Sequence, residues 1–180
     1  MPAITIKRIS KDLLKKRNIP YDYTARGGYD VSLKTTKKGW CVKIIENPDF
    51  HMVKTNKTTY RVIEHYKGES EVYLAYIDKQ EAGLLQIEHQ THNNSLRIWD
   101  IYVHKEHRKR GVGTALMNRT RERATELEAR RIILETQSCN MPAVTFYRKY
   151  GFQLAGVDVT NYSNDDIKKR EVRLEMAYYL

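Results

Sequence analysis

A basic, glycine-containing corner constrains the fold of this chain more than any other segment. Residues 103–113 read Val-His-Lys-Glu-His-Arg-Lys-Arg-Gly-Val-Gly and lie between an apolar predicted strand, 96–103, and an amphipathic helix predicted from about Val112. Glycines let the backbone bend closely around a ligand. The first turn of a helix presents free N–H groups and the positive end of its dipole. With three basic side chains at 108–110, such a corner suits a pyrophosphate group.

The corner differs from the common nucleotide-binding motifs. Its core, Arg108-x-x-Gly111-x-Gly113, lacks the third glycine of the dinucleotide fingerprint, and no Gly-Lys-Ser/Thr of a Walker loop follows. A basic surface turn with a glycine-assisted helix start is the alternative interpretation, because short motifs also match by accident.

Hydrophobic periodicity predicts an antiparallel meander followed by alternating helices and strands. The predicted strands are 72–77, 82–89, 96–103, 131–136, 152–160 and 172–179, and the predicted helices are 112–129 and 141–149. The first part of the chain is harder to interpret and is predicted to hold a strand at 4–9, a helical turn at 11–17, a hairpin of 29–35 with 40–46, a loop at 47–57 and a strand at 59–65. A short strand at 50–54 within that loop is the alternative. This order predicts an α/β (α+β) fold with one mixed, mostly antiparallel central sheet flanked by helices. We expect a single domain over 1–180, in which an N-terminal extension, 1–57, packs on a core, 58–180.

The composition narrows the class of protein. The chain has 180 residues and 41% hydrophobic residues, which indicates a globular protein, and its net charge of +10 favours an anionic partner such as a phosphorylated cofactor, a membrane surface or nucleic acid. No apolar run is long enough to cross a membrane, and the N-terminus lacks the apolar core of a signal peptide, so we expect a cytoplasmic protein. Cys41 and Cys139 are interpreted as reduced thiols. His104 and His107 are interpreted as solvated side chains, and no metal site is expected.

The corner and a second motif together resemble the GNAT superfamily of acyl-CoA-dependent N-acetyltransferases. The second motif consists of Leu134-Glu135-Thr136-Gln137 and Asn140-x-x-Ala143-x-x-Phe146-Tyr147-x-x-Tyr150-Gly151-Phe152. The resemblance covers about residues 60–180, and segments 134–137, 146–152, 156–158 and Tyr162 are most similar to the streptothricin acetyltransferases. It implies the GNAT fold, acetyl-CoA as cosubstrate and acetylation of a primary amine of a cationic antibiotic, in particular the β-lysine moiety of streptothricin.

Other acceptors and another class of function stay open. A GNAT enzyme could instead acetylate a polyamine, a peptide or a protein amine. A basic RNA-binding module whose corner grips phosphate is the alternative from another class. Under the main interpretation the partner is a small cationic amine, neither a nucleic acid nor a membrane partner is expected, and a homodimer is left open.

The resemblance also implies roles for individual residues. Tyr147 would be the general acid, although a core aromatic is the alternative and Phe146 fits that alternative better. Glu135 would be the general base, with Asp100 as a competing candidate. An acidic and aromatic acceptor pocket would be formed by Asp100, Glu135, Asp158 and Tyr162, whereas Asp165-Asp166 is interpreted as a solvated turn. Acetyl-CoA would contact Tyr102, Val103, Arg108, Lys109, Arg110, Gly111, Val112, Gly113, Thr114, Asn140, Ala143, Phe146 and Tyr147.

Overall fold

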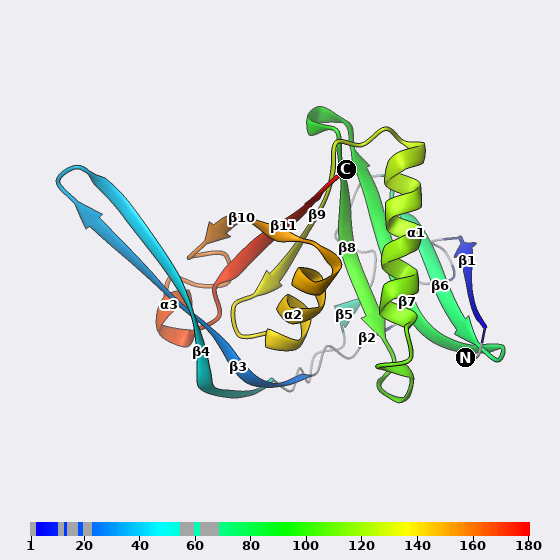
Figure 1. The fold of residues 1–180 in the computed structure, drawn as a ribbon, viewed down its shortest axis with the longest axis horizontal. Coiled ribbons are helices and arrows are strands. Elements are labelled where there is room, and N and C mark those ends of the chain that lie inside the picture. Colours follow the sequence, from blue (N-terminus) through cyan, green and yellow to red (C-terminus); the bar gives the residue numbers. More distant parts are fainter. Residues whose placement is uncertain (1–2, 11–12, 14–17, 20–22, 55–59, 62–68) are drawn as a thin grey trace. The chain divides into compact units, whose positions relative to one another are not determined.

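The chain divides into two compact units. The computed structural model describes residues 3–10, 13, 18–19, 23–54, 60–61 and 69–180 (Figure 1). Unit 1 consists of residues 1–20, 58–134 and 178–180, and unit 2 consists of residues 21–57 and 135–177. Most of the predicted helical turn at 11–17 and most of the predicted strand at 59–65 lie outside the described residues. The division into an extension and a core at residue 57 stays a prediction.

Unit 1 is built on an antiparallel meander. Its strands are β1 (Ile4–Ile9), β6 (Glu71–Ile77), β7 (Gln80–Gln90) and β8 (Ser95–Val103), followed by the start of β9 (Arg131–Gln137). The strand order is β1-β6-β7-β8-β9, antiparallel up to β8 and parallel between β8 and β9. Strands β2 (Asn18–Ile19) and β5 (Tyr60–Arg61) form a separate short pair. The predicted meander is therefore confirmed, with the boundaries of each strand shifted by only one or two residues.

Helix α1 (Val112–Glu126) packs on this meander (Figure 1). Its buried face includes Leu116, Met117, Thr120 and Ala124, as helical spacing predicts, and each of them is fully excluded from solvent. The helix ends at Glu126, three residues earlier than predicted. Short 3-10 helices follow β7 at Thr91–Asn93 (η2) and precede α1 at Lys105–His107 (η3).

A bulge in β8 shifts the alternation of buried and less buried side chains along the strand. Gln86 pairs with Asp100 and Ile87 with Ile98, so Trp99 is the additional residue on β8. Asp100 is only 5% exposed, whereas Trp99 is half-buried. The parallel pairing of β8 with β9 covers Ser95–Arg97 and ends there, although β8 continues to Val103.

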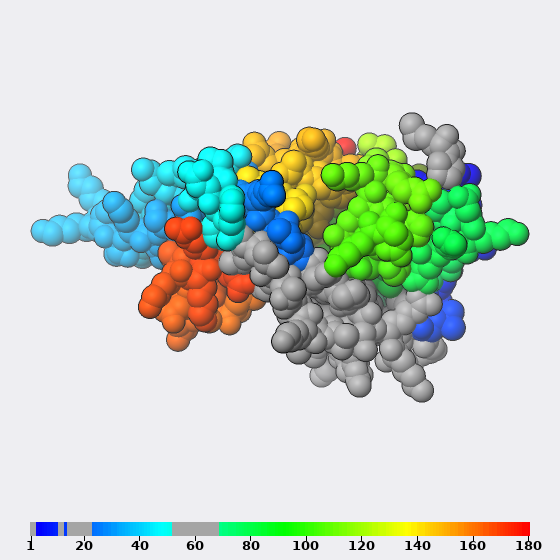
Figure 2. All heavy atoms as spheres, turned by 90° about the horizontal axis from the view of Figure 1, so that it is seen from below, coloured from blue at the N-terminus to red at the C-terminus, as the bar shows by residue number. Residues whose placement is uncertain are grey.

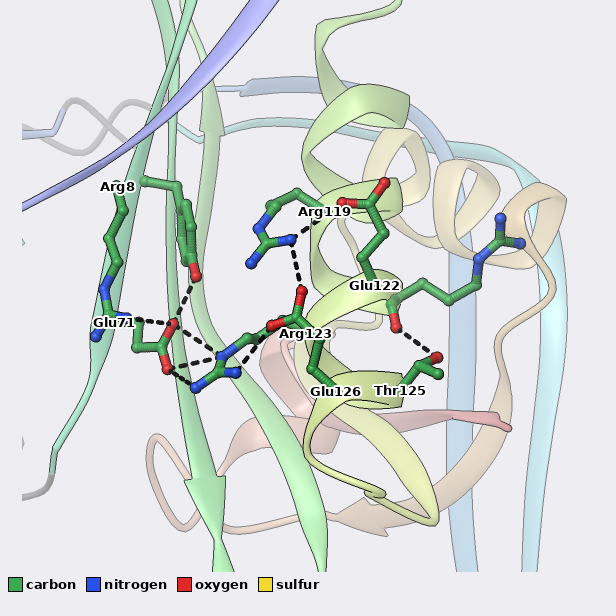
Figure 3. Close-up of polar contacts among 9 residues, drawn as sticks. Arg8, Glu71, Arg119, Glu122, Arg123, Thr125 and Glu126 are labelled. Atoms are coloured by element: carbon green, nitrogen blue, oxygen red, sulfur yellow. Dashed lines mark hydrogen bonds and ion pairs between the residues drawn. The ribbon is translucent and has the colours of Figure 1, made fainter.

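An ionic network joins α1 to β6 in unit 1 (Figure 3). Arg123 donates to Glu71 from Nε at 2.9 Å and from Nη2 at 2.7 Å, both to Oε1. Arg123 and Arg119 also contact Glu126, at 2.9 and 3.1 Å. Burial alone would favour the protonated form of Glu71, but the hydrogen bonds from Arg123 and Tyr73 hold the pKa of its carboxyl below the ordinary value.

Unit 2 contains a long hairpin, short helices and the strands at one edge of the main sheet. Its elements are β3 (Tyr23–Thr36), β4 (Gly39–Lys54), the end of β9, α2 (Met141–Tyr150), β10 (Gln153–Asp158), α3 (Asp166–Lys169) and β11 (Arg173–Tyr179). The strand order is β9-β11-β10, with β10 and β11 antiparallel. Together with unit 1, these strands confirm the predicted mixed, mostly antiparallel sheet flanked by helices.

The β3–β4 hairpin is much longer than predicted. The segment 47–54, predicted as part of a loop with a short strand at 50–54 as the alternative, continues β4 and pairs with the first residues of β3. One face of the distal hairpin carries Leu33, Val42 and Trp40, which are 42%, 47% and 79% exposed. Both views show this distal part projecting beyond the other elements of unit 2 (Figures 1 and 2).

The segment predicted as a solvated turn is a short helix with a buried carboxylate. Asp166, the first residue of α3, is 1% exposed. It accepts hydrogen bonds from the Tyr162 N–H and the Ser163 hydroxyl, both at 2.8 Å. Although burial opposes ionisation, these hydrogen bonds lower the pKa of the Asp166 carboxyl. The expectation of a solvated turn was therefore wrong for Asp166. Hydrogen bonds from two nearby donors offset the cost of burying its charge.

Across the described ranges, none of the helices combines the length and hydropathy that a bilayer crossing needs.

Candidate active site

The basic corner of unit 1 has the backbone geometry of an anion site. Lys109 and Gly111 both have positive φ, 61° and 87°, and Gly111 is the N-cap residue of α1. No side chain caps the helix, its first turn contains no acidic residue, and the Ala115 N–H donates to the Gly111 carbonyl at 2.9 Å. The N–H groups of residues 112–114 precede that first helical hydrogen bond. They are thus available to an anion at the positive end of the helix dipole.

The basic side chains of the corner are exposed. Arg108, Lys109 and Arg110 all reach solvent. Arg108 donates from Nε to the Val103 carbonyl at 3.2 Å, and Arg110 lies 3.2 Å from Nδ1 of His107. Since a guanidinium can only donate, His107 accepts there. His107 is 5% exposed, so the expectation of a solvated side chain was wrong for it.

A glycine that sequence reasoning missed sets the start of α1 against β7. A Cβ atom added to Gly83 would lie 2.6 Å from the Tyr102 carbonyl oxygen and 3.1 Å from Cγ1 of Val112. Both contacts are tighter than ordinary packing allows, so β7 must carry glycine where α1 and β8 approach it. The sequence did offer a signal for this position, because Gly83 lies inside a predicted strand. A glycine there often marks a place where another backbone approaches closely.

The second motif forms a capped helix in unit 2. Asn140 is the N-cap of α2, and its Oδ1 accepts a hydrogen bond from the Ala143 N–H at 3.3 Å. Gly151 follows the helix with φ of 110°, as a C-terminal glycine should. Asn140 therefore caps the N-terminus of α2.

Tyr147 is the more buried of the two aromatic residues in this motif. It is 8% exposed and its ring centroid lies 5.6 Å from that of Phe146 and 5.8 Å from that of Phe152. Phe146 is only half-buried, so the expectation that Phe146 fits the core better was wrong. Burial raises the pKa of the Tyr147 phenol, which keeps it protonated at neutral pH.

Glu135 is an ion-paired, half-buried carboxylate. Its Oε2 lies 2.9 Å from Nη2 of Arg173, and 36% of the side chain is exposed. Desolvation raises the pKa of Tyr162, the Glu135 carboxylate raises it further, and Arg173 lowers it. Glu135 and Arg173 therefore form an ion pair in unit 2, and their charges act in opposite directions on the pKa of Tyr162.

The structure distributes the remaining predicted residues between the units. Asp158 is exposed and accepts a hydrogen bond from the Thr160 N–H at 2.9 Å. Asp100 is buried in unit 1. The predicted residues of unit 1 are Asp100, Tyr102, Val103 and 108–114, and those of unit 2 are Glu135, Asn140, Ala143, Phe146, Tyr147, Asp158 and Tyr162. Within the described parts of the chain, no group of three or more His, Cys, Asp or Glu side chains could hold a metal ion.

Sequence reasoning missed a buried serine that joins three segments of unit 2. The Ser138 carbonyl accepts from the Tyr29 N–H at 2.9 Å, and its N–H donates to the Val172 carbonyl at 2.8 Å. Its Oγ accepts from the Val172 N–H at 3.1 Å and donates to the Arg170 carbonyl at 3.3 Å. Only the fold brings these donors and acceptors to Ser138.

Known proteins are similar to this chain in sequence and in fold. A profile of the Acetyltransferase (GNAT) family matches residues 42–152, more than half of the chain. "Streptothricin acetyltransferase A" of Bacillus subtilis (strain 168) is 39% identical over 92 residues, which are 51% of this chain and 53% of that protein. The chain spans about half the length of the curated relatives it matches.

Two solved structures match over nearly the full chain. A nourseothricin acetyltransferase is 26% identical with a TM-score of 0.75, over 98% of both chains. A putative streptothricin acetyltransferase from Bacillus anthracis str. Ames, in complex with acetyl coenzyme A, is 24% identical with a TM-score of 0.75, over 99% of this chain and 98% of that one. Because the second structure is only 24% identical to this chain, its similarity supports the fold and nothing beyond it.

Proposed function

The chain belongs to the acetyltransferase (GNAT) family, and from that premise we propose that it transfers the acetyl group of acetyl-CoA to a primary amine of a cationic antibiotic. The relatives that act on streptothricin and nourseothricin support this class of acceptor. We propose streptothricin as the substrate, with its β-lysine moiety as the acetylated part.

The single observation that carries the proposal is the uncapped N-terminus of α1 behind Gly111. A helix start without a capping side chain or an acidic residue, beside three exposed cationic side chains, fits a diphosphate. We propose that the N–H groups of residues 111–114 and the side chains of Arg108, Lys109 and Arg110 bind the diphosphate of coenzyme A. Tyr102 and Val103, at the end of β8, would lie along its pantetheine arm.

The remaining residues account for the protons of the reaction. A lysine-like amine has a pKa of about 10.4 and is almost fully charged at neutral pH. The ammonium must lose one proton before its nitrogen attacks the acetyl carbon, and the nitrogen loses a second as the C–N bond forms and the C–S bond breaks. We propose that solvent takes the first proton, that Glu135 takes the second as the C–N bond forms, and that the Tyr147 phenol donates its proton to the departing thiolate and is reprotonated from solvent.

Two carboxylates and one phenol of unit 2 suit a cationic acceptor. Glu135 and Asp158 are acidic, and Tyr162 adds an aromatic face that attracts ammonium groups. We propose that these three side chains bind the acceptor.

A thiol-release assay tests the proposal. Purified protein with acetyl-CoA and streptothricin should release free coenzyme A, and mass spectrometry of the product should place one acetyl group on the β-lysine moiety. Release with spermidine or with a peptide, but not with streptothricin, would keep the enzyme class and change the acceptor. Absence of acetyl-CoA binding together with salt-sensitive RNA binding would replace the proposal by a nucleic-acid function.

A further inference from the structure

The distal hairpin, residues 32–45 of β3 and β4, carries an exposed apolar face. Leu33 is paired with Val42, and Thr35 with Trp40, across the two strands. Residues opposite each other in an antiparallel pair lie on one face of the sheet, and so do residues two positions apart along a strand. Leu33, Trp40 and Val42 therefore share one face, and they are 42%, 79% and 47% exposed. Trp40 lies beside the turn, at the end that projects beyond the other elements of unit 2 (Figures 1 and 2).

The charged residues of the distal hairpin are all basic. Residues 32–45 contain no acidic residue, and the charged side chains, all exposed, are Lys34, Lys37, Lys38 and Lys43. Two of these lysines alternate with Leu33 and Val42 along the strands, so they lie on the face opposite the apolar one. The other two belong to the turn. The distal hairpin therefore has one apolar face and one basic face, which meet at a basic turn.

The acidic residues nearest in the sequence face arginines at the base of the hairpin. Asp30 and Glu46 flank the distal hairpin on either side. Oδ1 of Asp30 lies 3.5 Å from Nε of Arg170, and Oε2 of Glu46 lies 3.9 Å from Nη1 of Arg148. Each flanking carboxylate thus has an opposite charge beside it. The four lysines give the distal hairpin itself a net charge of +4.

The apolar face and the positive charge together indicate the chemistry of the partner. A second copy of the chain could cover the apolar face, but it would bring two sets of the same lysines together. A nucleic acid would attract the lysines, but it offers no hydrocarbon to Leu33 and Val42. A bilayer with anionic headgroups offers both, because amphipathic segments bury their apolar face at the boundary of headgroups and acyl chains while their basic side chains attract anionic lipids. Tryptophan is enriched at this level of a membrane.

We propose that the distal hairpin docks unit 2 on a lipid bilayer with anionic headgroups. Leu33, Trp40 and Val42 enter the boundary between headgroups and acyl chains, and the lysines lie among the headgroups. The contact is peripheral and reversible, since three side chains bury little apolar surface. The proposal departs from the sequence-based expectation of no membrane partner, because the apolar face exists only in the paired hairpin. It goes beyond the proposed function and does not depend on the acceptor.

Vesicle sedimentation tests the proposal. The wild-type protein should bind vesicles of phosphatidylcholine mixed with phosphatidylglycerol and should bind pure phosphatidylcholine vesicles much more weakly. Binding should weaken as salt is raised, because salt screens the lysines from the headgroups. The fluorescence emission of the exposed Trp40 should move to shorter wavelengths on binding, as its indole leaves water.

Matched variants assign the contact to the distal hairpin. Lys37→Gln with Lys38→Gln should weaken binding to the mixed vesicles at least about tenfold, since each basic residue near an anionic surface contributes about fivefold. Lys149→Gln with Lys168→Gln removes two exposed charges elsewhere in unit 2 and should change binding less than about twofold.

A second pair of variants tests the apolar face. Leu33→Ser should weaken binding to the mixed vesicles about threefold or more, because a leucine side chain no longer leaves water. Leu154→Ser makes the same change on β10, at a leucine that is 50% exposed, and should leave binding unchanged. Leu33 is an exposed position, so both variants should keep the melting temperature of the wild type.

Several results would overturn the proposal. These are no binding to the mixed vesicles at low salt, equal losses in the hairpin variants and their controls, and an unmoved tryptophan emission in protein that sediments with vesicles. A dimer that Leu33→Ser dissociates, without vesicle binding, would assign the apolar face to a second copy of the chain. RNA binding lost in the lysine variant, again without vesicle binding, would assign the basic face to nucleic acid. Thiol release is measured without vesicles, so the proposed function is tested separately.

Discussion

The guanidinium of Arg173 lies 2.9 Å from Oε2 of Glu135 and 3.6 Å from Oε1 of Glu175. Arg173 also donates to Asn161 at 2.8 Å. The carboxylate that interrupts the apolar pattern of β9 is therefore partly solvated and paired, which explains how the strand tolerates it. Whether Glu135 also moves a proton is a separate, measurable question.

Glu135→Gln should lower kcat by about 10²- to 10⁴-fold, the usual contribution of a general base. The amide oxygen can still accept from Arg173, so the change removes charge more than structure. The KM for acetyl-CoA should stay the same. Glu175→Gln, at the other carboxylate beside Arg173, is the matched control and should keep its kcat. A kcat of Glu135→Gln within twofold of the wild type would assign Glu135 to the ion pair alone.

Tyr147→Phe should lower kcat by about 10²-fold or more, because the phenol is the proposed acid. Its ring contacts with Phe146 and Phe152 remain possible for phenylalanine, so the melting temperature should change little. Calorimetric titration should find unchanged affinity for acetyl-CoA. Tyr150→Phe, on the same helix and also beside Phe152, serves as the control. Equal kcat values for the two variants would argue against a proton transfer from Tyr147.

Gly113→Ala should weaken acetyl-CoA binding without destabilising the protein. Unlike Gly111, Gly113 does not have a positive φ and lies inside α1, where alanine is favoured over glycine by up to about 1 kcal/mol. A methyl group there would nevertheless crowd a diphosphate held by the first-turn N–H groups. We expect an unchanged or higher melting temperature and a higher KM for acetyl-CoA. An unchanged KM would indicate that the diphosphate lies elsewhere.

Glu71→Gln should destabilise unit 1 by roughly 2 kcal/mol at pH 7, because it removes a charged acceptor from Arg123. The pKa of Glu71 is lowered in the folded state, so its contribution is complete above the unfolded value of about 4.3 and is lost as pH falls through the folded pKa. Urea titrations from pH 7 to pH 3 should show the difference between variant and wild type shrinking at low pH. Glu122→Gln, a 62% exposed partner of Arg119 in the same network, should change stability by at most about 1 kcal/mol (Figure 3). A difference between Glu71→Gln and wild type that stays constant with pH would contradict this account.

Some features were predictable because neighbouring residues encode them. The spacing of Gly111 and Gly113 behind three basic residues, Pro142 in the first turn of α2 and Gly151 just past its end each act within one turn of backbone. The meander was predictable for the same reason, since alternation along one strand reports which face is buried. The family resemblance used these same local motifs.

Only the tertiary structure decided the partners of the polar side chains. Glu71 and Arg123 are 52 positions apart, and Tyr23 and Gln137 are 114 apart, yet each pair is in hydrogen-bond contact. The bulge at Trp99, the burial of Asp166 and the close approach at Gly83 likewise depend on what packs against each segment. Periodicity in the sequence reports the burial of one element at a time, whereas the geometry of a contact between two elements is determined only when both are in place.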